Sequence, residues 1–140
     1  MRQDGNLITI LLSAMKAFML GWGMVVLYVV LNSFGSLTLK NQVQEIGQWS
    51  FTTTRSYFAY FIALFSSWKT WISIGAITAA TGAWIVALAN LELSRAYPVA
   101  IGLNLLIVVT LSFFVFHEPI SISKILGAVL ILSGVICLFR

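Results

Sequence analysis

The chain alternates between long apolar stretches and short polar breaks. Four of the apolar stretches, residues 17–39, 70–91, 97–116 and 120–139, are each about as long as a helix that crosses a bilayer. Such a helix needs about 20 mostly apolar residues to pass through ~30 Å of hydrocarbon. The pattern therefore predicts an all-α integral membrane protein with four transmembrane helices.

A shorter apolar stretch lies between the first two spans. Residues 57–67 are rich in Phe and Tyr, lie between Arg55 and Lys69, and follow a polar loop at 48–54. This stretch is too short to cross the hydrocarbon, so we expect a short interfacial or re-entrant helix.

The chain begins with a short apolar run inside a weakly charged segment. Residues 7–15 are apolar, with Arg2, Asp4 and Lys16 around them. The segment has almost no net positive charge and no small-x-small cleavage site, which argues against a cleaved signal peptide. We expect residues 1–16 to form an extension, either an interfacial helix or the first turns of a long first span. Residues 17–140 then form the four-helix transmembrane domain.

Composition supports the membrane interpretation. Hydrophobic residues make up 60% of the 140 residues and charged residues 9%, and the mean hydropathy is +1.00. Four spans leave no room for a soluble catalytic domain. The lone Cys137 excludes an intrachain disulfide, and the net charge of +4 is spread without a basic run. The charge is therefore read as a membrane property and not as a nucleic-acid footprint.

Basic residues near the span ends give no clear orientation. One side of the membrane would hold Arg2, Lys16, Arg95 and Arg140, and the other would hold Lys40, Arg55, Lys69 and Lys124. Membrane proteins normally show an excess of Lys and Arg on the cytoplasmic side. Either the chain inserts both ways, or a partner decides its orientation, or a boundary error misplaces Lys16 or Arg55.

Small residues predict where helices touch. In the second span they recur at every fourth position, as Gly75, Ala79, Ala83 and Ala87, and in the fourth span Gly127 and Gly134 lie seven apart. Small residues let helix backbones approach closely in lipid, so both stripes predict packing seams. The spacing alone does not say whether a seam packs within one chain or between two.

Polar residues inside the first and third spans are candidates for a site. Asn32, Ser36 and Lys40 share one helical face, and Asn104 lies midway along the third span. A buried amide in hydrocarbon needs a hydrogen-bond partner, so these groups should face protein or a water-filled cavity. They would either contact substrate or bond between helices, with Lys40 extending toward the headgroups.

The other polar residues have local explanations. Thr78 and Thr81 should bond to their own helix backbone. Glu92 and Arg95 should form a local ion pair, and the break His117-Glu118-Pro119 should open the fourth span. The chain shows no metal-ligand spacing, no paired carboxylates and no phosphate loop. We therefore expect no enzyme activity, no cofactor and no metal.

Four stretches of sequence carry a family resemblance. LNSFGSLTLK, SRAYPVAIGLN, FVFHEPIS and LGAVLILSGV resemble the four-helix, EamA-like branch of the drug/metabolite transporter superfamily. The pattern is similar to the small multidrug resistance family, and closer to the subunits that flip aminoarabinose linked to undecaprenyl phosphate. The resemblance covers about residues 20–140 and implies a multi-pass protein of the bacterial inner membrane.

The resemblance also implies what is missing. Its alignment places Asn32 where small multidrug exporters carry a proton-binding glutamate, and an amide cannot titrate. Tyr97 matches the substrate-facing tyrosine of the third helix, but Ala100 replaces the following tryptophan. The glycine pattern of the fourth helix matches Gly127 and Gly134, which implies a homodimer, or a heterodimer with a related small subunit.

These observations lead to a small transporter or flippase subunit that moves a lipid-linked sugar or a similar amphiphile. The expected substrate-binding residues are Asn32, Ser36, Lys40, Tyr97, Asn104 and Glu118. The alternatives are a proton-coupled multidrug or polyamine exporter that uses Glu92 or Glu118, and a membrane scaffold that transports nothing.

Overall fold

Five helices account for almost all of the structure, a computed structural model that describes residues 2–47, 54–117, 119 and 121–137. The helices are α1 (Arg2–Ile46), α2 (Thr54–Phe65), α3 (Trp68–Asn90), α4 (Leu93–Phe116) and α5 (Ile122–Cys137). The described residues contain no strand, as the prediction of an all-α protein requires. Three of the helices, α1, α3 and α4, are long and apolar enough to cross a membrane.

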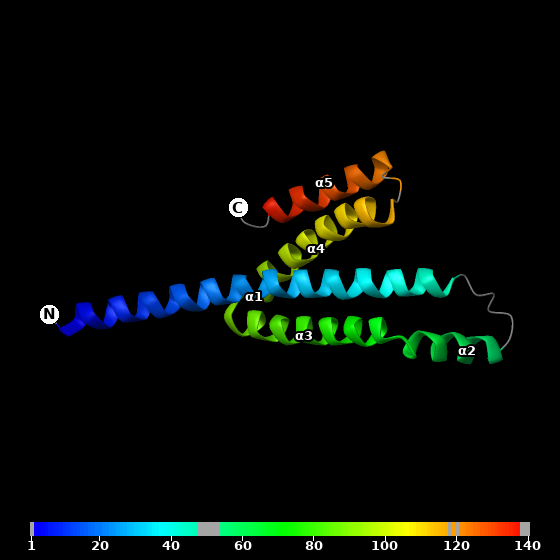
Figure 1. The fold of residues 1–140 in the computed structure, drawn as a ribbon. Coiled ribbons are helices and arrows are strands. Elements are labelled where there is room, and N and C mark those ends of the chain that lie inside the picture. Colours follow the sequence, from blue (N-terminus) through cyan, green and yellow to red (C-terminus); the bar gives the residue numbers. More distant parts are fainter. Residues whose placement is uncertain (1, 48–53, 118, 120, 138–140) are drawn as a thin grey trace.

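The long helix α1 organises the bundle (Figure 1). It lies antiparallel beside α3, and α4 rises from the turn after α3 and crosses α1 at an angle. Two glycines of α1 allow the contact with α3. A Cβ added at Gly35 would lie 2.8 Å from Cγ1 of Ile77, and one at Gly21 would lie 2.7 Å from Cγ of Leu91. Both distances are below van der Waals contact, so a side chain at either glycine would displace Ile77 of α3 or Leu91, the residue that follows α3.

The core is small and lies where α1, α3 and α4 meet. Its buried members are mostly small residues: Val25, Val29, Ala87, Ala96 and Ala100. Dispersion between closely approaching backbones drives helix association in lipid, where the solvent is as apolar as the side chains. The alanines at this junction therefore allow α1, α3 and α4 to approach closely enough to pack.

The buried stripe of α3 differs from the predicted one. Ala83 and Ala87 are buried as expected, but Gly75 and Ala79 are exposed, and the stripe continues through Ser73 and Ala80. Steps of four residues drift around a helix by about 40° each, whereas steps of seven drift by only about 20°. The predicted stripe used a step of four residues throughout, so its first members lie outside the face of α3 that α1 covers.

Helix α5 forms the outer layer. Among the described residues it contacts α4 alone, and none of its own residues is buried. The contact passes over Gly102, where an added Cβ would lie 3.4 Å from Cγ2 of Val135. In Figure 1, α5 lies against α4 on the side away from α1 and α3.

Several helix ends lie away from the predicted bounds. Helix α1 passes both ends of the predicted span at 17–39, so the extension and the first span are one helix. Helix α4 starts before Tyr97-Pro98, because the carbonyl of Glu92 already accepts bonds from Arg95 and Ala96. Pro98 is therefore inside the helix and does not open it.

Of the fourth predicted span, at 120–139, the structure describes a helix over Ile122–Cys137. Helix α5 has 16 described residues, about 24 Å at 1.5 Å per residue, against ~30 Å of hydrocarbon. Pro119 precedes this helix and is not part of its first turn. Helix α2, with 12 residues, is the short helix expected near 57–67, although it starts three residues earlier, at Thr54.

Candidate substrate-binding site

Three polar side chains meet between α1 and α4. Oδ1 of Asn104 accepts a hydrogen bond of 2.8 Å from Oγ of Ser33 and one of 3.3 Å from Nδ2 of Asn32. Ser33 is 1% exposed, and the two asparagines are half-buried. The structure thus brings together two predicted site residues, Asn32 and Asn104, at one polar cluster inside the bundle.

Ser33 was missed by sequence reasoning, which chose Ser36 on the face shared with Asn32 and Lys40. Ser36 is exposed and lies outside the cluster. The signal that could have found Ser33 is the stripe Val25, Val29, Ser33, which recurs every fourth residue and is buried throughout. A serine that continues a buried valine stripe needs a partner on the facing helix.

Lys40 lies one helix turn beyond Ser36, toward the end of α1. Its Nζ lies 4.4 Å from the centre of the Phe116 ring, which holds the cation over an aromatic face at the end of α4. The half-buried side chain of Lys40 also lines a cavity of about 300 Å³ between α1, α4 and α5.

Tyr97 belongs to an aromatic group at the other end of α4. The ring of Trp84 lies 5.0 Å from that of Tyr28 and 6.2 Å from that of Tyr97, centre to centre. The three rings come from α1, α3 and α4, and Tyr97 remains 54% exposed. Trp84 could not be expected here from the sequence, because a tryptophan in an apolar span is typical of a membrane-facing residue.

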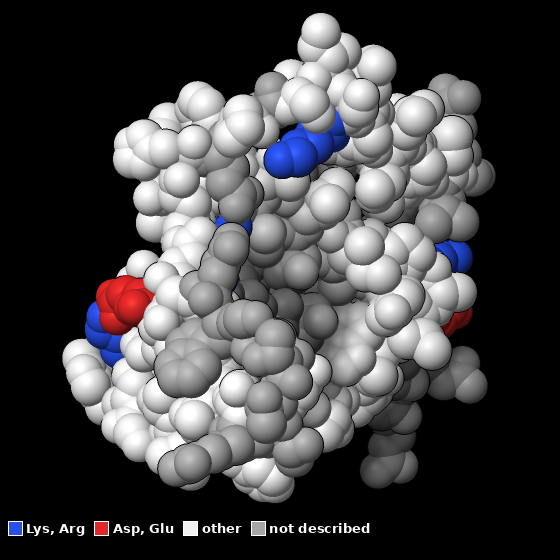
Figure 2. All heavy atoms as spheres, turned by 90° about the vertical axis from the view of Figure 1, so that its right-hand side faces the viewer, with Lys and Arg blue, Asp and Glu red and all other residues white. Residues whose placement is uncertain are grey.

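Figure 2 shows the end of the molecule at which α1 finishes and the chain turns from α4 to α5. The surface is mostly uncharged and is hollowed near its middle, and some of its few Lys or Arg side chains lie beside an Asp or Glu side chain. A second hollow, of about 390 Å³ and mainly apolar, lies here between α1, α3 and α4, with Lys69 at its edge.

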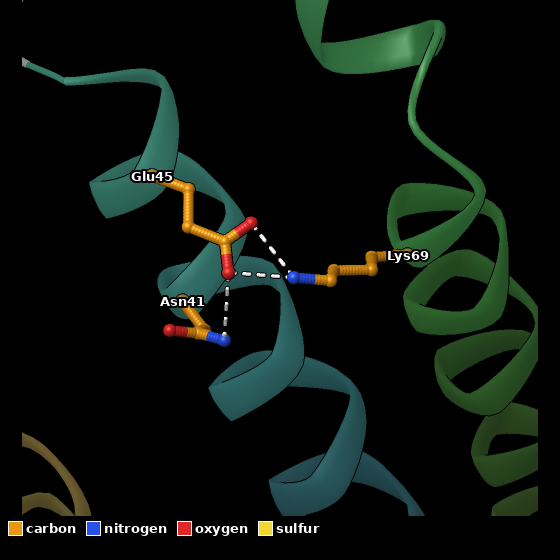
Figure 3. A network of polar contacts seen from close by, with 3 residues as sticks. All are labelled: Asn41, Glu45 and Lys69. Atoms are coloured by element: carbon orange, nitrogen blue, oxygen red, sulfur yellow. Dashed lines mark hydrogen bonds and ion pairs between the residues drawn. The ribbon is translucent and has the colours of Figure 1, made fainter.

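Lys69 is held by an ion pair that joins α1 to the start of α3. Its Nζ lies 2.5 Å and 2.7 Å from the carboxylate oxygens of Glu45, and Nδ2 of Asn41 donates to the same carboxylate at 3.4 Å (Figure 3). The pair is partly exposed, with 33% and 47% of the two side chains accessible. It therefore closes the end of the α1–α3 contact.

The described acidic side chains are all paired. Glu45 contacts Lys69, and Glu92 contacts Arg95 at 3.3 Å in the turn before α4, as predicted. Glu118 lies outside the described residues. Both described carboxylates lie at helix ends, Glu45 near the end of α1 and Glu92 just before α4. No group of three or more His, Cys, Asp or Glu side chains gathers in the described part of the chain.

The hydroxyls of Thr78 and Thr81 bond to the backbone of their own helix, as predicted. Gln42 was not singled out from the sequence. It is 7% exposed, and its Oε1 accepts no hydrogen bond from any described residue. An amide oxygen buried in this way costs free energy, so Gln42 is a further polar feature at this end of α1.

Comparison with known proteins gives one consistent group of relatives. The chain is 33% identical over 65 residues to a probable 4-amino-4-deoxy-L-arabinose-phosphoundecaprenol flippase subunit ArnE of Pseudomonas fluorescens, covering 46% of the chain and 56% of the relative. It is 34% identical over 75 residues to the ArnE of Pseudomonas paraeruginosa, covering 54% of the chain and 64% of the relative. The chain thus spans less than two thirds of the length of these two ArnE proteins.

A longer match is to a relative named ArnF. The chain is 30% identical over 112 residues to a probable flippase subunit ArnF of a second Pseudomonas fluorescens strain, covering 74% of the chain and 82% of the relative. No protein-family profile and no solved structure matches the chain.

Proposed function

The chain belongs to the family of ArnE and ArnF flippase subunits, and from this premise we propose that it is one subunit of a flippase for a sugar linked to a lipid phosphate. The relatives are named for 4-amino-4-deoxy-L-arabinose-phosphoundecaprenol, and the proposed substrate is of that class. As a protein with three membrane-capable helices, the chain is a multi-pass membrane protein. We place it in the bacterial inner membrane, where a flippase would meet such a lipid.

The observation that carries the proposal is the polar cluster of Asn32, Ser33 and Asn104. Its groups are neutral and can donate and accept hydrogen bonds, which suits the hydroxyl groups of a sugar. The cluster joins α1 to α4 inside the spans, where polar side chains are candidates for contact with a substrate. Tyr97 on α4 would border the same path.

The phosphate of the substrate requires a cation. Lys40 is about two helix turns beyond the cluster toward the end of α1, and it lines a cavity. Lys40 would therefore attract the phosphate while the sugar lies toward Asn32 and Asn104. Ser36, exposed between them on α1, and Glu118 would act on the same path.

A second subunit would complete the path. Gly134 of α5 is exposed, Gly127 is half-buried, and an added Cβ at either glycine would meet nothing within 4 Å. We propose that α5 is the fourth span and that its glycine face packs against a second copy or a related small subunit, as small residues do in lipid.

The first turns of α1 suit the membrane surface. Helix α1 measures about 68 Å at 1.5 Å per residue, twice the hydrocarbon thickness. In the sequence, polar residues recur every three or four positions along one side of this segment: Arg2, Asn6, Thr9, Ser13 and Lys16. The opposite side exposes Leu11, Met15 and Phe18. We propose that residues 2–20 bend at Gly21 or Gly23 and lie in the interface.

The alternative of a proton-coupled exporter requires a membrane-buried carboxylate, which the described side chains do not include. Exchange of protons for cations needs a carboxylate inside the membrane, and both described carboxylates are paired at helix ends. In the alignment with small multidrug exporters, Asn32 stands at the position of their proton-binding glutamate. Its side chain instead bonds to Asn104. The flippase proposal does not need such an acid.

Proteoliposomes test the proposal directly. The purified chain, alone and with a coexpressed small subunit, is assayed for translocation of a fluorescent polyprenyl phosphate sugar. Asn104→Ala should reduce the rate at least tenfold, whereas Asn90→Ala should not, because the Asn90 amide bonds only to its own helix at Val86. Equal rates for both variants, or no translocation in either preparation, would overturn the proposal.

A further inference from the structure

The cavity between α1, α4 and α5 carries two cations. Lys40 comes from the end of α1, and Lys124 comes from the first turn of α5, yet both line the same space of about 300 Å³. That volume is at the lower end of the range for small-molecule sites. Two ammonium groups at one cavity repel each other unless an anion lies between them.

The walls of this cavity divide into a polar and an apolar part. Ser112 of α4 adds a hydroxyl, while Val108, Val109 and Phe113 form the apolar side. Ser112 and Lys40 are half-buried. An anion with an attached hydrocarbon chain would find a matching surface for each of its parts.

The beginning of α5 strengthens the preference for an anion. The Nζ of Lys124 donates to the carbonyl of Pro119 at 3.3 Å, which holds the side chain back over the start of its own helix. The carbonyl of Ser121 already accepts bonds from Lys124 and Ile125, so the helix is formed from its first turn. The N-terminus of a helix carries a partial positive charge, which adds to the two lysines.

Lys40 is positioned for the same purpose. Its ammonium group lies over the Phe116 ring, on the side of α4 where the apolar hollow of about 390 Å³ begins, and Phe116 lines that hollow. The cation–π contact holds the group at the boundary between the two spaces. A phosphate bound at Lys40 would thus leave its hydrocarbon chain next to an apolar groove.

We infer that Lys40 and Lys124 together form a binding site for the phosphate of an isoprenoid lipid phosphate, with the anion between the two helices. This inference deepens the proposed function and rests on it for the class of lipid. Lys124 is a residue that no sequence pattern singles out, and it joins the site only through the fold.

Binding of a short lipid phosphate tests the site. Isothermal titration of the full chain in nanodiscs uses farnesyl phosphate, farnesol and inorganic phosphate as separate probes. Farnesyl phosphate should bind, and the affinity should fall as salt rises. Farnesol should bind at least tenfold more weakly. If the site binds the phosphate of a lipid, inorganic phosphate should also bind weakly. Equal affinity for inorganic phosphate and farnesyl phosphate would overturn the assignment to a lipid.

Lysine variants locate the binding. Lys40→Met and Lys124→Met should each weaken farnesyl phosphate about five- to tenfold, because each removes one charge near the anion. Lys124→Arg should retain most of the affinity. Arg95→Met, at the opposite end of α4, is the matched control and should leave the affinity unchanged. Lys124 is exposed, so its variants test the site even if Lys40→Met does not fold.

The outcomes separate this inference from the proposed function. Unchanged affinity in Lys124→Met, beside working translocation in the unaltered chain, would overturn the dibasic site and leave the flippase proposal standing. Lysine-dependent binding without translocation, alone or with a partner, would support the site and overturn the flippase proposal.

Discussion

Ser33 donates a hydrogen bond of 2.8 Å to Oδ1 of Asn104, joining residues 71 positions apart in the chain. The bond crosses from α1 to α4 inside the membrane-spanning part of the bundle. It fixes the rotation of both helices about their axes, because a turn of either would bury a hydroxyl or an amide without a partner.

Asn104→Leu tests this junction. The substitution removes the acceptor of both Ser33 and Asn32, so two donors lose their partner. Interhelical hydrogen bonds in membranes contribute about 0.6 kcal/mol on average and at most about 1.7. We therefore expect the variant to lose about that much free energy of unfolding per bond. The loss is measured in detergent as a lower midpoint temperature of thermal unfolding. Asn90→Leu is the control, and an equal loss in both variants would contradict the role of the junction.

Gly35→Val should separate α1 from α3. An added Cβ would meet Ile77 at 2.8 Å and the carbonyl oxygen of Ser73 at 3.0 Å, and the latter is backbone that cannot rotate away. Overpacking of this kind costs about 1–3 kcal/mol. Thermal unfolding measures the loss. Gly75→Val is the matched control on the lipid side of α3, where nothing lies within 4 Å; a larger loss there would refute the packing account.

Exchanging the charges of Glu45 and Lys69 should leave the protein intact. Each single reversal, Glu45→Lys or Lys69→Glu, places like charges together at the end of the α1–α3 contact and should lower the unfolding midpoint. The double reversal should restore it. Because both side chains are partly exposed, the coupling free energy should be below about 1 kcal/mol and should shrink in high salt. Additive effects of the two reversals would show that the pair contributes nothing.

The first turns of α1 can be located by fluorescence. In a Cys137→Ser background, single cysteines at Met15 and Lys16 carry an environment-sensitive dye in nanodiscs. If the segment lies in the interface, the dye at position 15 should shift to the blue and be quenched by lipid-borne quenchers, and the dye at position 16 should remain in water. Similar signals at both positions would indicate a helix that is either fully embedded or fully in water.

The helices themselves could be predicted because apolar length is a property of the sequence alone. All five helices overlap the predicted segments. The end of α1 could not be predicted, since the apolar stretch stops at Leu39 and the residues after it are mostly polar. They stay helical beside α3, where Glu45 and Asn41 find Lys69 and where Gln42 is buried.

The polar cluster between α1 and α4 was predicted only in part, for a related reason. A polar residue inside a span indicates that it needs a partner, and Asn32 and Asn104 meet that expectation by bonding to each other. Ser33 joins them because of the rotation of α1 about its axis. That rotation is set by the buried valines and not by the polar residues. Lys124 is a stronger case, because only the fold brings it to the cavity that Lys40 also lines.

The outer position of α5 also affects how a pair of subunits could evolve. Within the described chain this helix rests on α4 alone and buries none of its own residues. If α5 packs against a second subunit, as proposed, substitutions on its outward surface should alter the choice of partner without disturbing the fold of α1, α3 and α4. A gene duplication could then turn a self-pairing chain into two chains that prefer each other, through changes confined to one helix.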